Sequence, residues 1–282
     1  MSDPLGGRGG LSINLATIRE QCDMSQAIDA CLRHSITAIS PWRDQIAAIG
    51  LDTAARLVRD NDLTVTGVCR GGMFTASDAA GRRAAIDDNL RAIDEAASLN
   101  ADCLVLVVGG LPEGSRDIAG ARQMVTDGIG AVLDHARAAA VPLAIEPLHP
   151  MYAADRCCVN TLAQALDMCE TLAPGNGGDL GLAIDAYHVW WDPELAAQIA
   201  RAGREGRILA HHICDWLVPT HDLLLDRGMM GDGIIDLSAF RDMIERAGFH
   251  GHQEVEIFSA ENWWKRDADL VLETCIARYR AI

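Results

Sequence analysis

Lysine is almost missing from this 282-residue sequence: among its 24 lysine and arginine residues, Lys265 is the only lysine. Enzymes that form an imine with a substrate carbonyl need an amine that can lose its proton, and arginine cannot supply one. We therefore do not expect a lysine-dependent aldolase or a pyridoxal phosphate enzyme. The sequence also lacks G-x-S-x-G, Walker A, G-x-G-x-x-G and H-E-x-x-H motifs, and no stretch resembles an RNA-binding aromatic platform.

The sequence also has few positively charged residues and no long apolar runs. Forty acidic residues outnumber the 24 basic ones, which gives a net charge of −16 and a pI near 4.8. We expect no nucleic-acid partner, because sequence-independent binding needs a concentrated basic surface. We also expect no membrane partner, because no run approaches the ~18 apolar residues of a membrane span. Residues 1–10, MSDPLGGRGG, have no apolar signal core and are expected to be flexible.

The nine cysteines include no C-x-x-C pair. Their number is odd, their spacing is irregular and most lie in apolar segments. We therefore expect buried, reduced thiols instead of disulfides or a zinc site. This use of cysteine is typical of a cytoplasmic protein.

Short apolar runs alternate with longer amphipathic ones along the whole chain. The short runs predict parallel strands buried on both faces: Leu11–Asn14, Thr37–Ser40, Val65–Val68, Leu104–Val108, Leu143–Ile145, Gly181–Ile184, Ile208–Ile213 and Glu254–Ile257. The amphipathic runs predict helices: Met24–His34, Leu51–Asn61, Arg82–Leu99, Gly120–Ala139, Thr161–Leu172, Pro193–Ala202, Leu237–Ala247 and Asn262–Arg280. Eight such units of about 35 residues predict an α/β fold over residues 1–282, a single (β/α)8 TIM barrel. A doubly wound sheet is the alternative, but the glycine fingerprint that usually follows its first strand is missing.

Four residues with metal-ligating side chains stand at or near the ends of the last four predicted strands. They are Glu146, Asp185, His212 and Glu256, and they are separated by 39, 27 and 44 residues. Each separation is close to one βα unit. Because the carboxyl ends of barrel strands meet at one mouth, we expect the four side chains to converge there.

The sequence around the acids is unfavourable to an isolated charge. Glu146 and Asp185 each follow a buried apolar strand, where an ionised carboxylate is costly unless it is paired or binds a cation. Three carboxylates and one imidazole suit one divalent ion, with Mn²⁺ placed first and Co²⁺, Mg²⁺ or Zn²⁺ as alternatives. The alternative for any single acid is a cap on the following helix.

The segments around these residues resemble the strand ends of the xylose isomerase-like TIM barrels. They read LAIEP (143–147), IDAYH (184–188), HHICD (211–215) and GFHGHQEVEIF (248–258). This superfamily contains sugar isomerases and epimerases, inosose-processing enzymes and AP endonucleases of the endonuclease IV type. The resemblance covers nearly the whole chain from Leu11 and implies a metal site at Glu146, Asp185, His212 and Glu256.

The resemblance also implies roles for individual residues. Glu146 and Glu256 match the acid/base pair of a cis-enediolate mechanism, and His188 matches a histidine that contacts substrate or a second metal. A Lewis acid on a carbonyl acidifies the neighbouring C–H bond, and nearby carboxylates can then move the proton. The expected function is therefore metal-dependent isomerisation or epimerisation of a sugar or cyclitol.

Two departures from the family pattern matter. Ketose epimerases of this superfamily usually carry an arginine six residues after the metal histidine, and that position is Val218 here. Residues 215–235 form an extended active-site loop instead, and its Arg227 is the candidate replacement. Endonuclease IV-like enzymes use extra histidines after strands 3 and 4, where this chain has Cys69-Arg70 and Gly109-Gly110. Cleavage of damaged DNA therefore ranks low.

Several further residues are candidates for the surroundings of the site. Arg70 and the tryptophans Trp216 and Trp264 are candidate substrate contacts, although aromatic residues more often fill gaps under loops. Glu254, Asp215 and His149 are candidate partners of the metal-ligating groups.

Two other functions stay open. One is a lyase or dehydratase that acts on a keto-sugar, keto-glycoside or keto-inositol through the same enediolate. The other is a non-catalytic carbohydrate-binding or partner subunit. Sparse cationic residues near the strand ends favour an unphosphorylated substrate, and a homodimer or homotetramer is common in barrels of this kind.

Overall fold

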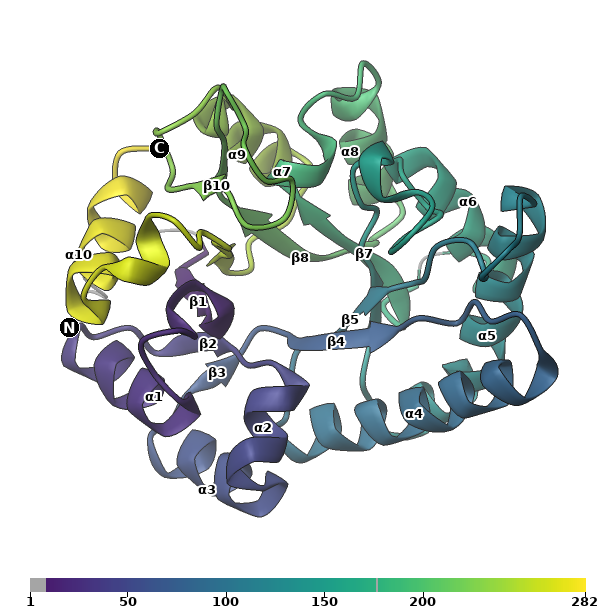
Figure 1. The fold of residues 1–282 in the computed structure, drawn as a ribbon, viewed down its shortest axis with the longest axis horizontal. Helices are drawn as coiled ribbons and strands as arrows, with labels where there is room; N and C mark the ends of the chain where they lie inside the picture. The colour runs from purple at the N-terminus through teal and green to yellow at the C-terminus, as the bar shows by residue number, and fades with distance from the viewer. Residues whose placement is uncertain (1–8, 176) are drawn as a thin grey trace.

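Parallel strands form the centre of the computed structural model, which describes residues 9–175 and 177–282 (Figure 1). The predicted flexible segment 1–10 lies outside the described residues, apart from Gly9 and Gly10. The nine-stranded sheet has the order β3-β2-β1-β11-β8-β7-β6-β5-β4. Its strands are β1 (Leu11–Asn14), β2 (Ala38–Ser40), β3 (Thr64–Val65), β4 (Val68–Gly72), β5 (Leu104–Val107), β6 (Leu143–Ile145), β7 (Leu180–Asp185), β8 (Ile208–Ile213) and β11 (Gln253–Val255). The predicted TIM barrel is confirmed.

The two end strands of this sheet, β3 and β4, are consecutive pieces of one segment, which closes the barrel. The sequence predicts a single third strand over Val65–Val68, and the structure divides it into Thr64–Val65 and Val68–Gly72. The Thr66 N–H bonds to Ile39 of β2, and the Val68 N–H bonds to Cys103 before β5. The segment therefore changes partners at Thr66 and Gly67, which is why two short strands replace the predicted one.

Helices surround the barrel in Figure 1 and cover the outer face of its strands. They are α1 (Met24–Arg33), α2 (Arg43–Ile49), α3 (Leu51–Asp60), α4 (Ala79–Ser98), α5 (Ile118–Ala138), α6 (Leu162–Leu172), α7 (Ala186–Val189), α8 (Leu195–Arg204), α9 (Leu237–Arg246) and α10 (Ala268–Tyr279). The helices predicted to begin at Met24 and Leu237 do begin there, because the Asp23 and Asp236 carboxylates each accept a backbone N–H of the first turn.

The last predicted helix is wrong at its start. The sequence predicts a helix from Asn262, whereas α10 begins at Ala268, after a short 3-10 turn at Trp263–Lys265. Arg266 is extended, and the Asp267 carboxylate caps the new helix by accepting the N–H groups of Asp269 and Leu270. Helix α2, before α3, has no counterpart among the predicted elements.

Small apolar side chains fill the barrel beneath its mouth. They form a cluster separate from the larger core between strands and helices: Cys69, Cys103, Val105, Ala144, Ala183 and Ala210. Strand side chains alternate between faces, so His211 points out of the barrel and stacks on Phe240 of α9, with ring centroids 5.4 Å apart. All nine cysteines lie within the described residues as free thiols, and all but Cys22 are buried. Within the described residues, no helix is both long and apolar enough to cross a membrane.

Candidate metal centre and active-site cavity

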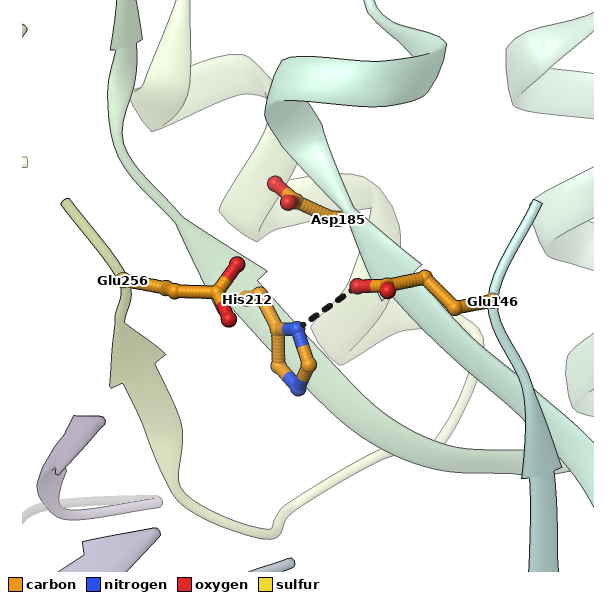
Figure 2. Close-up of side chains that lie close together, drawn as sticks. All are labelled: Glu146, Asp185, His212 and Glu256. Atoms are coloured by element: carbon orange, nitrogen blue, oxygen red, sulfur yellow. Dashed lines mark hydrogen bonds and ion pairs between the residues drawn. The ribbon is translucent and has the colours of Figure 1, made fainter. Parts of the chain in front are cut away.

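Four polar side chains point toward one another at the mouth of the barrel (Figure 2). Glu146 directly follows β6, Asp185 ends β7, His212 lies in β8 and Glu256 directly follows β11. The strand ladder sets their positions: Asp185 pairs with His212 in register, and the Glu146 and Glu256 N–H groups donate to the neighbouring strand segments. The predicted convergence of these four residues, called here the four-residue cluster, is therefore present.

The donor set of the four-residue cluster fits a single divalent ion. One ligand atom from each residue lies within 4.8 Å of the others. Two ligands on opposite sides of an ion, each about 2.2 Å away, are about 4.4 Å apart. Separations of up to 4.8 Å therefore leave room for a single ion between the four groups. All four side chains are buried, with residue exposures of 5% or less, and mixed carboxylate and imidazole ligation suits Mn²⁺, Co²⁺ or Zn²⁺.

Arg227 lies directly against two acids of this cluster. Its Nη1 atom is 3.0 Å from Asp185 Oδ2 and 2.8 Å from Glu256 Oε2. Its guanidinium also lies over the rings of Tyr187 and Phe258, 4.5 and 5.0 Å from their centroids. Burial alone would lower the pKa of Arg227, but the two carboxylates raise it well above its ordinary value. The guanidinium is thus a fixed positive charge beside the candidate metal centre.

His212 lies between two other acids. Its Nδ1 atom is 3.1 Å from Glu146 Oε1, and its Nε2 atom lies 3.5 Å from Glu254 Oε1 without a hydrogen bond. Burial alone would lower the pKa of His212, but the Glu254 and Glu146 carboxylates raise it well above its ordinary value. Asn14 joins the network, because its amide donates to Glu254 at 2.8 Å and to Glu256 at 3.0 Å. Glu254, which pairs in register with His212, therefore contacts both His212 and Asn14.

Asp185 caps the helix that follows it and also faces Arg227. Its Oδ1 atom accepts the Tyr187 N–H at 2.8 Å and so caps the short helix α7, while Oδ2 faces Arg227. Burial raises the pKa of Asp185 although Arg227 opposes that shift. Burial likewise raises the pKa of Glu256, again against the effect of Arg227. Both groups would be stabilised as carboxylates by a cation in their midst.

The extended loop predicted at 215–235 contains an antiparallel hairpin of β9 (Asp215–Trp216) and β10 (Arg227–Gly228). Asp215 is fully buried, and its carboxylate accepts the N–H groups of Gly231, Gly233 and Ile235 at 2.9–3.0 Å. Asp215 therefore holds the hairpin in place and does not face the four-residue cluster. Pairing of Arg227 with Trp216 sets the arginine beside the cluster, whereas Val218 is 68% exposed.

A cavity of about 130 Å³ opens onto the four-residue cluster. Its acidic wall contains Glu146 and Glu256, and its remaining charged or titratable lining residues are Arg70, Arg156, Arg227 and His188. Its aromatic and apolar lining residues are Trp42, Tyr152, Phe258, Val107, Leu148 and Leu224. Such a mixture of apolar walls and a few convergent polar groups is typical of a small-molecule site.

Five of the twelve predicted site residues line this cavity: Arg70, Glu146, His188, Arg227 and Glu256. His188 and Arg70 line it, and the His188 Nε2 atom is 3.2 Å from Arg227 Nη2. His149 stands behind His188: its backbone N–H donates to His188 Nδ1, and its ring stacks on Trp216 at 5.1 Å.

The two predicted tryptophan contacts are corrected. Neither Trp216 nor Trp264 is among the lining residues. Trp216 packs against Tyr187, Trp190 and His149, and the Trp264 indole N–H donates to the Ala16 carbonyl. These rings fill space around the hairpin and under the loop after β11, which is the commoner role of such residues.

Trp42 and Arg156 are two of the lining residues that sequence reasoning missed. Trp42 lies just beyond Pro41 after β2, so its place near the end of a predicted strand could have revealed it. Its indole N–H donates to Asn14 Oδ1 at 2.7 Å, and its ring meets Phe258 edge to face at 5.6 Å. Arg156 lies in the segment after β6 that pairs with Gly109, and nothing in the local sequence marks it.

The family model described as "Xylose isomerase-like TIM barrel" matches residues 26–275. Among solved structures, protein SMc04130 from Sinorhizobium meliloti 1021 is 71% identical, with a TM-score of 0.94, and the match covers 96% of this chain and 97% of that one. No curated protein matches the chain.

More distant structures share the fold. The IolI protein with a bound zinc atom is 22% identical, with a TM-score of 0.80 and 95% coverage of both chains. D-Psicose 3-epimerase from Clostridium cellulolyticum H10, solved with D-tagatose, is 14% identical, with a TM-score of 0.75 and 96% coverage of both chains.

Proposed function

The chain belongs to the xylose isomerase-like TIM barrel family, and from this premise we propose that it is a divalent-metal-dependent isomerase or epimerase of a small sugar or cyclitol. One observation carries the proposal: Glu146, Asp185, His212 and Glu256 converge within 4.8 Å at the floor of a cavity that Glu146 and Glu256 line. This arrangement combines a set of ligands for an ion with two carboxylates that can reach a bound substrate.

The four-residue cluster would hold the ion. When bound, a divalent ion polarises a substrate carbonyl and so lowers the pKa of the neighbouring C–H bond. The zinc of the similarly folded IolI structure supports a metal in this barrel, and we propose Mn²⁺ first, with Co²⁺, Mg²⁺ and Zn²⁺ as alternatives.

Glu146 and Glu256 are the proposed acid/base pair. They follow β6 and β11, which lie on opposite sides of β7 and β8 in the sheet order. Carboxylates that approach the substrate from different sides can remove a proton from one carbon and return one to the same carbon or its neighbour. Burial raises the pKa of Glu256, which favours its function as a proton acceptor near neutral pH.

Three other residues would orient the substrate. His188 and Arg227 present ring and guanidinium nitrogens along the cavity wall, and Trp42 offers an aromatic surface to the C–H face of a sugar. The walls Val107, Leu148 and Leu224 exclude water from the reacting carbons.

A lyase or dehydratase is the second candidate, and the hairpin favours it. The epimerase arginine position is occupied by the exposed Val218, and Arg227 reaches the cavity from β10 instead. An arginine at a different place in the site could stabilise a leaving hydroxyl. Proton abstraction by the same glutamates would then be followed by loss of water, not by reprotonation.

Solvent deuterium exchange distinguishes these functions. The chain would be incubated with Mn²⁺ and a panel of keto-sugars and inososes in ²H₂O, and products would be analysed by NMR and mass spectrometry. Deuterium uptake with a rearranged or inverted carbon indicates an isomerase or epimerase, whereas loss of water indicates the lyase.

Matched glutamine variants test the proposed acid and base functions of Glu146 and Glu256. We expect Glu146→Gln and Glu256→Gln to lower exchange by at least about 100-fold, while the exposed Glu113→Gln in the loop after β5 keeps the wild-type rate. Mn²⁺ binding by each variant is measured in parallel. Exchange at the wild-type rate in both site variants would overturn the acid/base assignment.

A further inference from the structure

Two arginines that line the active-site cavity make few contacts with acidic groups. Arg70 lies in β4, and within the described residues its guanidinium has no hydrogen bond or ion pair. Arg156 lies in the segment after β6, where its Nε atom is 3.6 Å from the Oδ2 atom of its sequence neighbour Asp155. Its guanidinium lies 5.7 Å from the centroid of the Tyr152 ring. Both side chains therefore keep most of their donors available.

Arg43 and Arg227, in contrast, each have close carboxylate partners. Arg43 forms ion pairs with Asp88 and Glu95. Arg227, the third arginine of the cavity, is committed to two carboxylates of the four-residue cluster. An incoming anion would thus find free donors at Arg70 and Arg156, but not on the Arg227 Nη1 atom.

The two free arginines also repel each other. Burial lowers the pKa of Arg70, and the neighbouring positive charge of Arg156 lowers it further. A partly buried cation without a partner is costly, and a second cation nearby adds to that cost. An anion between the two guanidinium groups would remove both penalties, and planar guanidinium groups bind carboxylate and phosphate oxygens in a bidentate manner.

The position of Arg70 suggests which end of a ligand it would meet. Arg70 and Trp42 line both the active-site cavity and an adjoining open cleft of about 430 Å³. The cavity itself, at about 130 Å³, holds few atoms beyond those that contact Glu146 and Glu256. A substrate with its reacting carbons at the glutamates would direct its far end toward Arg70 and the cleft.

We propose that Arg70 and Arg156 form an anion subsite, and that the substrate is a small keto or hydroxy compound with a carboxylate or phosphate at the end remote from the reacting carbons. This inference rests on the proposed function, because it places the reacting carbons at the metal centre. An anionic substrate differs from the neutral sugar expected from the sequence. That expectation rests on the few cationic residues near the predicted strand ends, and Arg156 lies far from any of them.

The test uses hydroxamates, which bind divalent ions and resemble an enediolate. Two matched pairs of probes differ in one anionic group: butyrohydroxamate against succinomonohydroxamate for a carboxylate, and glycolohydroxamate against phosphoglycolohydroxamate for a phosphate. Dissociation constants are measured by titration calorimetry with the Mn²⁺-loaded chain. We expect at least one anionic probe to bind about tenfold or more tightly than its neutral counterpart, and the larger ratio identifies carboxylate or phosphate.

Arginine variants locate the source of that preference. Arg70→Met and Arg156→Met should each reduce the ratio of neutral-probe to anionic-probe dissociation constants severalfold. The neutral probe should bind both variants as it binds the wild type. Arg70→Lys should retain part of the preference for the anionic probe. The exposed Arg246→Met on α9 is the control and should keep the full ratio. Arg156 is itself 40% exposed in its side chain, so its substitution tests the subsite even if Arg70 variants fold poorly.

Three outcomes would refute the inference in distinguishable ways. Equal binding of neutral and anionic probes by the wild type would overturn the subsite while leaving the metal centre intact. If both methionine variants still prefer the anionic probe, residues other than Arg70 and Arg156 cause that preference. Failure of every probe to bind the Mn²⁺-treated chain would reject the metal centre, and the subsite with it.

Discussion

Replacement of Arg227 with methionine should destabilise the chain strongly in chelator and much less in the presence of metal. The guanidinium is 4% exposed and supplies the close positive charge for Asp185 and Glu256, at 3.0 and 2.8 Å. Loss of one partner of a buried ion pair costs about 3–5 kcal/mol, because the remaining charges stay buried. Methionine retains much of the apolar contact with Tyr187 and Phe258, so the loss reports mainly on charge.

A bound divalent ion would supply the missing charge to the same two carboxylates. We therefore expect Arg227→Met to lose about 3–5 kcal/mol in EDTA and less than about half of that with saturating Mn²⁺. The same cycle predicts tighter Mn²⁺ binding by the variant, since the competing guanidinium is gone. Equilibrium urea unfolding with and without Mn²⁺ measures the stability loss in EDTA and the stability loss with metal. The difference between the two gives the change in Mn²⁺ affinity.

Arg207 provides the matched control. It is fully buried, but it donates to the Leu180 and Ala173 carbonyls and pairs with Glu170, away from the four-residue cluster. Arg207→Met should lose the same stability with and without Mn²⁺. An Arg227→Met chain that is as stable as the wild type in EDTA, or equally destabilised in both conditions, would refute the reasoning.

Three further substitutions test the packing around the site by urea unfolding. His211→Phe should raise stability by about 1 kcal/mol, because both ring nitrogens are buried without a partner and the ring already stacks on Phe240; a loss would contradict this. Asp215→Asn should cost about 2 kcal/mol and expose the hairpin to proteolysis, because four backbone N–H groups lose their charged acceptor; unchanged protease resistance would argue against that role. Arg43→Met should cost about 1 kcal/mol at pH 7. Since Arg43 lowers the pKa of Asp88, the difference from wild type should be full above an aspartate's ordinary pKa of about 3.9 and shrink as the pH falls below it, whereas a constant difference would exclude that linkage.

The strand-end residues could be predicted because barrel topology determines where they meet. Parallel strands joined by helices all end at one mouth, so a carboxylate after LAI or GLAI must face its counterparts from neighbouring strands. Alternation along β8 likewise separates His212, which faces the barrel, from His211, which faces α9. These conclusions need only the period of the strands and the direction of the chain.

The cations around the site could not be assigned in the same way. Arg227 reaches the four-residue cluster through the register of a hairpin with a ten-residue connection between its strands, and nothing in the loop sequence specifies that register. Arg156 reaches the cavity because its backbone pairs with Gly109 near the end of β5. Both depend on tertiary pairing of irregular segments, which periodicity does not encode.

The proposed function requires the four-residue cluster to bind one divalent ion. Titration calorimetry of Mn²⁺ into the chelator-treated chain should give one ion per chain. His212→Ala should weaken that binding by at least about 100-fold, while the outward-facing His211→Phe should leave it unchanged. Absence of binding by the wild type, or equal affinity in the His212→Ala variant, would contradict the proposed metal centre.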